Sequence, residues 1–135
     1  MAKSDTFQCS VVTPEATILE CPASFVAFPA HDGEMGVLFN RAPLVCKLGI
    51  GQLRVESPDG DRVLYVDGGF AEVSDNRLTL LTEQARDPSD LDCAAADQAL
   101  IEARAMKISD EASLDARTNS IKRAQVQIKL AKSLG

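Results

Sequence analysis

Residues 28–48 read FPAHDGEMGVLFNRAPLVCKL and contain two glycines and two prolines. These residues are Pro29, Gly33, Gly36 and Pro43, set among apolar side chains. Glycine permits positive φ angles and close backbone approach, whereas proline fixes φ and removes a hydrogen-bond donor. The pattern therefore predicts the end of one strand, a tight turn at residues 32–33, a short strand through Val37 and Leu38, a loop over residues 40–43 and another strand from Leu44.

Two blocks of the sequence resemble the signatures of one protein family. Residues 32–45, DGEMGVLFNRAPLV, are similar to the signature loop of the ε subunit of F-type ATP synthases, which is called δ in mitochondria. Residues 67–76, DGGFAEVSDN, are similar to the second signature of that family. Arg41 departs from the family, which commonly has histidine there, but the Ala-Pro-Leu that follows is intact. The two blocks and the helical C-terminal third come in the family's order.

The resemblance implies a fold and a role. The implied fold is an N-terminal antiparallel β-sandwich of about ten strands over residues 1–86, followed by a C-terminal antiparallel two-helix hairpin over residues 87–135. The implied role is that of a non-catalytic rotor subunit in the central stalk, which couples proton flow through the c-ring to ATP synthesis. The implied partners are the γ subunit, the c-ring subunits, and the α and β subunits of the catalytic head.

Six residues are expected at the interface with the c-ring and the γ subunit, by their position in the family motif. Three of them are expected in the loop that faces the c-ring, namely Glu34, Met35 and Gly36. The other three flank that loop and are Arg41, Ala42 and Pro43. The resemblance thus places the contact at a loop between two strands.

The residue pattern before residue 87 predicts a β-domain without help from the resemblance. Residues 7–11 alternate between apolar and polar, as a half-buried strand does. Further strands are expected at residues 17–20, 24–28, 44–48, 52–56, 62–66, 70–73 and 78–81, with Cys21-Pro22 separating the second from the third. Residues 57–60, SPDG, and 74–76, SDN, are hairpin signals. Many short strands without intervening helices favour an antiparallel sandwich or barrel.

From residue 89 the chain fills with helix-forming residues. A first helix is expected from a cap at Ser89 to residue 107, and a second helix after a cap at Ser109 or Asp110. The expected apolar faces are Leu91, Ala94, Ala95, Ile101, Ala105 and Ile108 on the first helix, and Leu114, Ile121, Ala124, Ile128 and Ala131 on the second. Few large side chains lie on these faces, so we expect a weakly docked hairpin that can detach or open.

Basic residues gather at the C-terminus. Residues 117–135 contain five basic and no acidic residues, whereas residues 1–116 contain 9 basic and 20 acidic residues. The five are Arg117, Lys122, Arg123, Lys129 and Lys132. One interpretation is a solvated helix face whose cations favour the C-terminal end of the helix dipole. The other is a helix that docks on an acidic partner, and the resemblance implies that this partner is the β subunit and that docking restrains ATP hydrolysis.

A nucleotide site is the alternative function that the hairpin suggests. Residues 91–96, LDCAAA, fall where some bacterial members of the family carry an ATP-binding motif of the form Ile/Leu-Asp-x-x-Arg-Ala. Leu91, Asp92 and Ala96 match that motif, but Ala95 stands in place of the arginine. Alanine cannot replace a guanidinium that recognises phosphate, which argues against the site and leaves Asp92 as a helix cap.

Composition excludes several other classes. A net charge of −6 and 4% aromatic residues disfavour nucleic acid. No apolar run approaches the roughly 20 residues that span a bilayer, so direct membrane insertion is not expected. The N-terminus has neither a signal-peptide nor a transit-peptide pattern. The resemblance then implies a peripheral protein at the cytoplasmic face of a bacterial inner membrane, and the lack of a transit-peptide pattern favours this over a thylakoid.

Candidate catalytic and metal-binding residues are sparse. The four cysteines form no CxxC pair and are expected to be reduced structural thiols. His31 is the single histidine and has no orienting partner or nucleophile at an arguable spacing. The sequence therefore predicts no catalytic residue, no metal site and no required cofactor.

Overall fold

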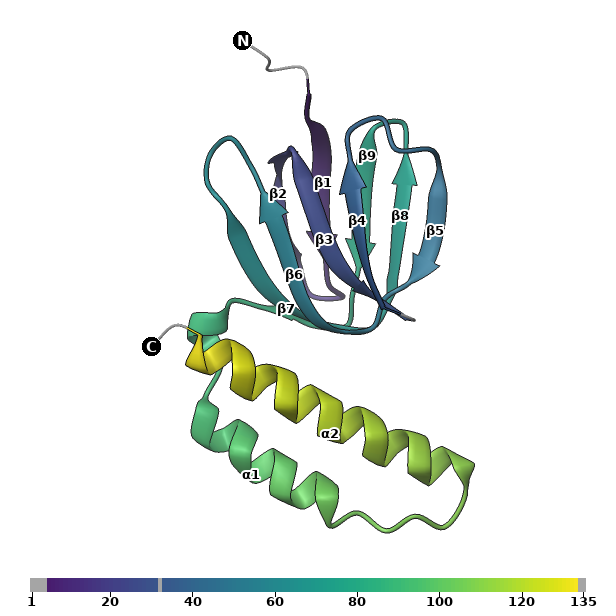
Figure 1. The fold of residues 1–135 in the computed structure, drawn as a ribbon, viewed down its shortest axis with the longest axis vertical. Coiled ribbons are helices and arrows are strands. Elements are labelled where there is room, and N and C mark those ends of the chain that lie inside the picture. Colours follow the sequence, from purple (N-terminus) through teal and green to yellow (C-terminus); the bar gives the residue numbers. More distant parts are fainter. Residues whose placement is uncertain (1–4, 32, 134–135) are drawn as a thin grey trace. The chain divides into compact units, whose positions relative to one another are not determined.

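Ten strands come first along the chain and two helices follow (Figure 1). The structure is a computed structural model that describes residues 5–31 and 33–133. It divides into two units, Met1–Ala85 and Arg86–Gly135. The β-sandwich followed by a helical hairpin is the fold class that the sequence predicts, and it is confirmed.

The first sheet has five strands. In their order across the sheet they are β2 (Thr17–Ala23), β1 (Phe7–Val12), β9 (Arg77–Leu81), β8 (Phe70–Ser74) and β5 (Leu44–Lys47). Strands β1 and β9 pair in parallel, whereas β1–β2, β8–β9 and β5–β8 are antiparallel. The sheet is thus mixed, because the first strand of the chain lies beside the ninth.

The second sheet also has five strands. In order they are β10 (Ala85–Arg86), β7 (Arg62–Asp67), β6 (Ile50–Glu56), β3 (Phe25–Ala30) and β4 (Gly33–Leu38). The two sheets enclose one apolar core, as alternating strands require. Its largest fully buried aliphatic and aromatic members include Val11, Val26, Phe28, Leu53, Leu64, Leu78 and Leu80.

Both predicted hairpins are present. Gly60 has a φ of +126° and donates its N–H to the carbonyl of Ser57 at 3.0 Å, which closes the β6–β7 turn. Asp75 and Asn76 have φ angles of +54° and +58°, which is the two-residue pattern of a type I′ hairpin between β8 and β9. Local turn chemistry therefore decides both connections.

Strand β2 extends further than expected. It continues through Cys21 and Pro22 to Ala23, so the predicted break at Cys21-Pro22 is wrong and the interruption falls at Ser24. β2 lies at the edge of its sheet, with Pro22 opposite Gln8. An edge strand can accommodate a residue without an N–H donor, which explains why the proline does not end it.

The helical unit consists of a 3₁₀ turn η1 (Pro88–Asp90), α1 (Cys93–Arg104) and α2 (Glu111–Lys132). Helix α1 is capped by Asp92 and ends at Arg104, so the expected cap at Ser89 and end at residue 107 are wrong. Asp87 caps η1 instead, and Ser89 lies inside that turn. The predicted cap at Asp110 is confirmed, because Asp110 and Ser113 form a reciprocal capping box. Hydrogen bonds from Ser113 lower the pKa of the exposed Asp110 carboxyl.

Helices α1 and α2 run side by side as an antiparallel hairpin (Figure 1). The buried residues within them are Ala96 and Ala103 of α1 and Ala124 and Leu130 of α2. The face expected on the first helix is largely wrong, because Ala94, Ala95, Ile101, Ala105 and Ile108 are exposed. On α2, Ala124 is buried and Ile121, Ile128 and Ala131 are half-buried, but Leu114 is exposed.

Cys9 provides a test of the sandwich core. Its side chain is fully buried, and burial followed by the proximity of Cys21 raises the pKa of its thiol to about 12. Because the thiolate is the reactive form, we expect Cys9 to be alkylated roughly a thousandfold more slowly at pH 8 than an exposed cysteine. Mass spectrometry after timed alkylation would measure this, with urea-unfolded protein as the control. Native alkylation of Cys9 as fast as in urea would contradict the packing described for β1.

Candidate partner-binding surfaces

Residues Glu34, Met35 and Gly36 lie on β4, at the edge of the second sheet. The prediction that they form a loop is wrong, because pairing between β3 and β4 continues to Ala30 and Gly33. Met35 is half-buried and packs against the core, whereas Glu34 and Gly36 are exposed. Only Glu34 and Gly36 of this trio therefore present themselves to a partner.

Residues 39–43 form the loop after β4, as the sequence predicts. Arg41 and Ala42 line a hollow of about 420 Å³ together with Gly36. The remaining lining residues are Phe25, Leu38, Phe39 and Asn40. Glu34 lies toward the other end of β4, about 13 Å from Leu38 at the usual rise per strand residue. The structure thus brings Gly36, Arg41 and Ala42 together and sets Glu34 apart along the same edge. We call the exposed residues Glu34, Gly36, Arg41, Ala42 and Pro43 the β4 edge.

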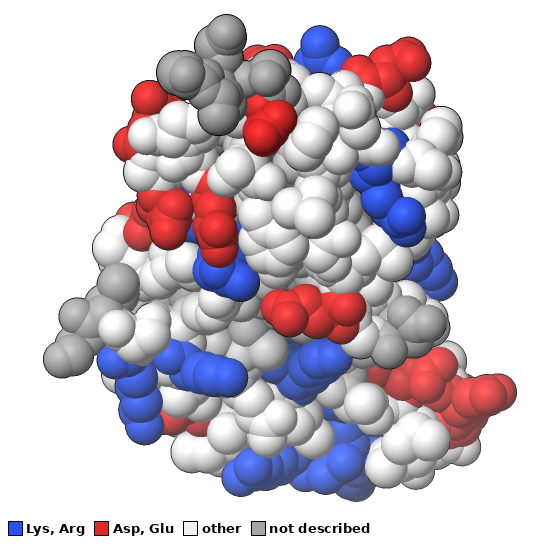
Figure 2. Space-filling view, turned by 45° about the horizontal axis from the view of Figure 1, so that its top comes forward, with Lys and Arg blue, Asp and Glu red and all other residues white. Residues whose placement is uncertain are grey.

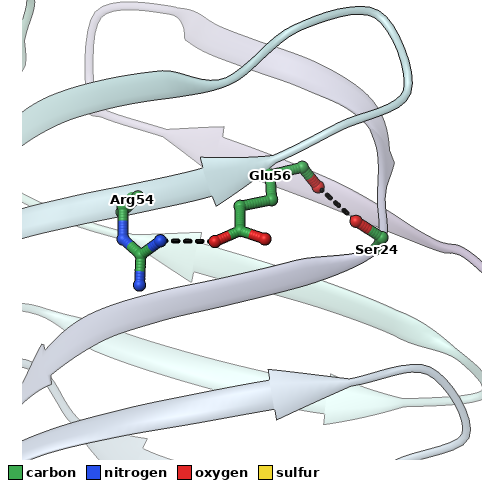
Figure 3. A network of polar contacts seen from close by, with 3 residues as sticks. All are labelled: Ser24, Arg54 and Glu56. Carbon is green, nitrogen blue, oxygen red and sulfur yellow. Dashed lines mark hydrogen bonds and ion pairs between the residues drawn. The ribbon is translucent and has the colours of Figure 1, made fainter.

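The Phe25 ring occupies the space that Gly36 leaves open. A Cβ on Gly36 would lie 2.9 Å from Cε1 of Phe25. The guanidinium carbon of Arg54 lies 5.5 Å from the centroid of the same ring. Arg54 also forms an ion pair with Glu56, whose carbonyl accepts a hydrogen bond from Ser24 Oγ at 3.1 Å (Figure 3). This surface is therefore ordered by side chains of β3 and β6, behind the β4 edge.

An apolar patch lies on the outer face of the first sheet. Its members are Val45, Phe70 and Leu81, which are 66%, 52% and 53% exposed. Phe70 pairs with both Leu81 and Lys47, so the three apolar side chains share one face of β5, β8 and β9. Phe70 and Leu81 also line a hollow of about 390 Å³ with Val12 and Pro14. Several large exposed apolar side chains on one face of a sheet are typical of a protein–protein interface.

Sequence reasoning did not identify the apolar patch, although a signal for it exists. Ala71, Val73, Leu78 and Leu80 are buried, which sets the inward phase of β8 and β9. Phe70 and Leu81 are apolar residues on the opposite phase. Large apolar residues on the outward phase of a strand are the pattern that marks such a surface.

The five predicted basic residues of α2 do not form one surface. Arg117 is half-buried, and its Nη2 donates to the carbonyl of Arg104 at the end of α1 at 3.3 Å. Arg123 is half-buried and lines a groove of about 370 Å³ between the two helices. Both arginines therefore contribute to the hairpin itself.

Three lysines of α2 face solvent. Lys122, Lys129 and Lys132 are exposed, and we call them the lysine row. At 3.6 residues per turn they fall within an arc of about 80°, opposite the midpoint between Ala124 and Leu130. Figure 2 shows basic side chains gathered on the helical unit towards the C-terminal end of α2, with acidic ones at its other end. The lysine row is thus the part of the basic cluster that is available to an acidic partner.

The predicted nucleotide residues, Leu91 and Asp92, line none of the three hollows described above. Leu91 is buried, and the Asp92 carboxylate accepts hydrogen bonds from the N–H groups of Ala94 and Ala95 at 3.0 and 3.2 Å. Neither residue lines the groove between the helices. Asp92 acts as a helix cap, which is the alternative that the sequence left open.

Comparison with known proteins identifies the family. The model described as "ATP synthase, Delta/Epsilon chain, beta-sandwich domain" matches residues 6–88. The chain belongs to the ATP synthase delta/epsilon family. The family inferred from residues 32–45 and 67–76 is thereby confirmed.

Curated members of the family extend the match over the hairpin. The ATP synthase epsilon chain of Rhodopirellula baltica is 39% identical over 127 residues, which is 94% of this chain and 99% of the relative. The epsilon chain of Syntrophomonas wolfei is 36% identical over 135 residues, which is 99% of this chain and 93% of the relative. The chain is therefore similar to epsilon chains over both of its units.

Solved structures agree with this assignment. A chain in the cryo-EM structure of Euglena gracilis mitochondrial ATP synthase, described as OSCP/F1/c-ring, has a TM-score of 0.81 and 27% identity, covering 97% of this chain and 82% of that one. A chain in the Tetrahymena thermophila mitochondrial ATP synthase central stalk and c-ring has a TM-score of 0.72. At 16% identity this second chain supports the fold alone.

Two further findings bear on the role of this ATP synthase delta/epsilon family member. Across residues 5–31 and 33–133, no helix is long and apolar enough to cross a bilayer. Within the same residues, no cluster of three or more His, Cys, Asp or Glu side chains could hold a metal ion. Three surfaces described above suit binding to other macromolecules, namely the β4 edge, the apolar patch and the lysine row.

Proposed function

We propose that the chain is a non-catalytic rotor subunit in the central stalk of a bacterial F-type ATP synthase. The observation that carries the proposal is similarity to epsilon chains along both units, together with a 27%-identical structural match in an assembly described as OSCP/F1/c-ring. In this role the chain couples proton flow through the c-ring to ATP synthesis. It lies at the cytoplasmic face of the inner membrane without entering the bilayer.

Each partner is assigned to a surface by chemistry. The β4 edge presents Glu34 and Arg41, whose opposite charges suit the polar loops of a c-ring. The apolar patch suits the γ subunit, because a permanent stalk contact requires buried apolar area. Met35 is left out of the contact because it packs inward.

The lysine row is assigned to an acidic segment of the β subunits. Since the buried residues of α1 and α2 are mostly alanine, little apolar area holds the hairpin closed. An open hairpin carries the lysine row to the catalytic head and restrains ATP hydrolysis there. Arg117 has a different role, because it joins α2 to the end of α1 in the closed hairpin.

A test compares the full chain with a chain ending at Arg86, each added to an ATP synthase complex stripped of its own epsilon subunit. The sandwich has its own core, so the shortened chain is expected to fold and to bind. We expect both to bind with similar affinity and only the full chain to slow ATP hydrolysis, by severalfold. If neither chain binds, the stalk assignment is wrong; if both bind and hydrolysis is the same, the restraining role of the hairpin is wrong.

Nucleotide sensing is a second candidate, supported only by the groove between α1 and α2. The groove of about 370 Å³ is lined by Arg123, Ser120 and Gln127, which could contact a phosphate or a base. The absence of Leu91 and Asp92 from its lining and the alanine at position 95 oppose the idea. Calorimetric titration of the chain with ATP decides it, and a flat titration at millimolar ATP removes this candidate.

A further inference from the structure

The side chain of Asn76 lies where three segments of the sandwich meet. Its Nδ2 donates a hydrogen bond to the carbonyl of Thr6 at 2.9 Å. Its Oδ1 accepts a hydrogen bond from the backbone N–H of Asn40 at 2.7 Å. Its own carbonyl accepts from the N–H of Gln8 at 3.2 Å. The β8–β9 turn is thus tied both to the start of β1 and to the loop that follows β4.

The tie reaches the loop of the β4 edge. All five residues of the loop at 39–43 are exposed, so burial contributes little to holding its conformation. Asn40 has a φ of +59°, which lies in the left-handed region that most residues other than glycine, asparagine and aspartate avoid. The next residue is Arg41. The hydrogen bond from Asn40 to Asn76 therefore acts where the loop needs support.

Asparagine is the residue that this junction requires. Its amide supplies a donor for the Thr6 carbonyl and an acceptor for the Asn40 N–H at once. It also tolerates the φ of +58° found at this turn position. Aspartate would keep the acceptor and lose the donor, and glycine would keep the backbone angle and lose both. Asn40 and Asn76 belong to the two sequence blocks, residues 32–45 and 67–76, that resemble the family signatures.

We propose that Asn76 is a positioning residue, which holds the loop at residues 39–43 so that Arg41 and Ala42 are presented to the c-ring. This inference rests on the proposed function for the identity of the partner. The claim that Asn76 holds the conformation of the loop does not depend on which partner binds there. Asn76 is far in sequence from the residues that it positions, so the role follows only from the fold.

The first measurement concerns the loop alone, in the isolated full chain. Amide hydrogen exchange by NMR is compared for the native chain, Asn76→Gly, Asn76→Asp and the control Asp75→Gly. Asp75 is the exposed neighbour in the same turn, with a φ of +54°, so its replacement matches the backbone change without touching the junction. We expect exchange at Asn40 to become about fivefold faster in Asn76→Gly and to stay near native in Asp75→Gly. Asn76→Asp should show a smaller rise than Asn76→Gly, because its carboxylate keeps the acceptor for Asn40 but faces the Thr6 carbonyl.

The second measurement is affinity for the ATP synthase complex stripped of its epsilon subunit. Asn76→Gly is expected to weaken binding about fivefold and Asn76→Asp to weaken it less, while Asp75→Gly stays within about twofold of native. Partial rescue by aspartate links the effect to the hydrogen bond with Asn40, since aspartate restores only that acceptor and not the donor to Thr6.

The outcomes of the two measurements distinguish the positioning role of Asn76 from the proposed function of the chain. Unchanged Asn40 exchange in Asn76→Gly overturns the positioning role, whatever the binding result. Faster exchange with native binding shows that the loop is held by Asn76 but is not part of the contact, which overturns the functional half of the inference. If the native chain does not bind the complex, the proposed function fails, while the exchange result still decides whether Asn76 holds the loop.

Discussion

Gly69→Ala is expected to destabilise the sandwich by about 4 kcal/mol or to prevent its folding. A Cβ at residue 69 would lie 1.8 Å from the carbonyl oxygen of Leu81 and 2.9 Å from the Cα of Thr82. These are backbone atoms of the neighbouring chain segment, so they cannot rotate away as a side chain could. The φ of +105° adds strain for any residue with a side chain.

Gly68→Ala is the matched control for this prediction. Gly68 also has a positive φ, +70°, but a Cβ there would meet nothing within 4 Å. Gly68→Ala should therefore lower the free energy of unfolding by only about 1 kcal/mol, which is the conformational cost of a positive φ for alanine. Urea unfolding followed by Tyr65 fluorescence measures both variants, because Tyr65 is the single tyrosine of a chain without tryptophan and is buried in the sandwich. Equal midpoints for the two variants would contradict the close approach of residue 69 to β9.

Turns were predictable because their chemistry lies within the turn residues themselves. In the β8–β9 hairpin, Asp75 and Asn76 adopt positive φ, which aspartate and asparagine tolerate better than most residues. The cap at Asp110 is similar, since Ser113 three residues later completes a reciprocal pair. Such features require no knowledge of the rest of the fold.

Features that depend on a partner strand were not predictable in this way. Pro22 stays within β2 because β2 is an edge strand, and nothing in residues 17–23 shows which strand lies at the edge. Glu34 and Gly36 belong to β4 because pairing with β3 continues through Gly36 as far as Gly33. The family motif located these residues, but strand pairing decides that they line an edge and that Met35 points inward.

The first helix shows the limit of hydrophobic patterning. Asp87, Ser89 and Asp92 can all cap a helix, and the structure uses Asp87 for η1 and Asp92 for α1. Alanine recurs so often in α1 that several apolar faces fit equally well, and the face that is buried contains Ala96 and Ala103. For the candidate site, the basic run was visible in sequence, but only packing separates Arg117 and Arg123 from the lysine row.

Replacing Lys122, Lys129 and Lys132 together by glutamine is expected to relieve the restraint on ATP hydrolysis. Each exposed ion pair contributes about 0.2–1 kcal/mol, so losing three shifts the balance between restrained and active complexes by about tenfold. Glutamine retains a polar side chain and a similar helix propensity while removing the charge. Arg117 is left unchanged because its loss would also weaken the hairpin through Arg104.

Ionic strength and a control that neutralises two other cations of the hairpin decide whether the lysine row itself is responsible. Salt screens exposed charges, so hydrolysis by the complex with the native chain should rise between low and physiological ionic strength, whereas the triple variant should be high and flat. The control is Arg104→Gln with Lys107→Gln, two exposed cations of the hairpin that lie outside the lysine row. A control that releases hydrolysis as fully as the triple variant would mean that net charge matters and position does not. A triple variant that stays restrained and salt-sensitive would remove the lysine row as the contact, because the attraction would have to come from other residues.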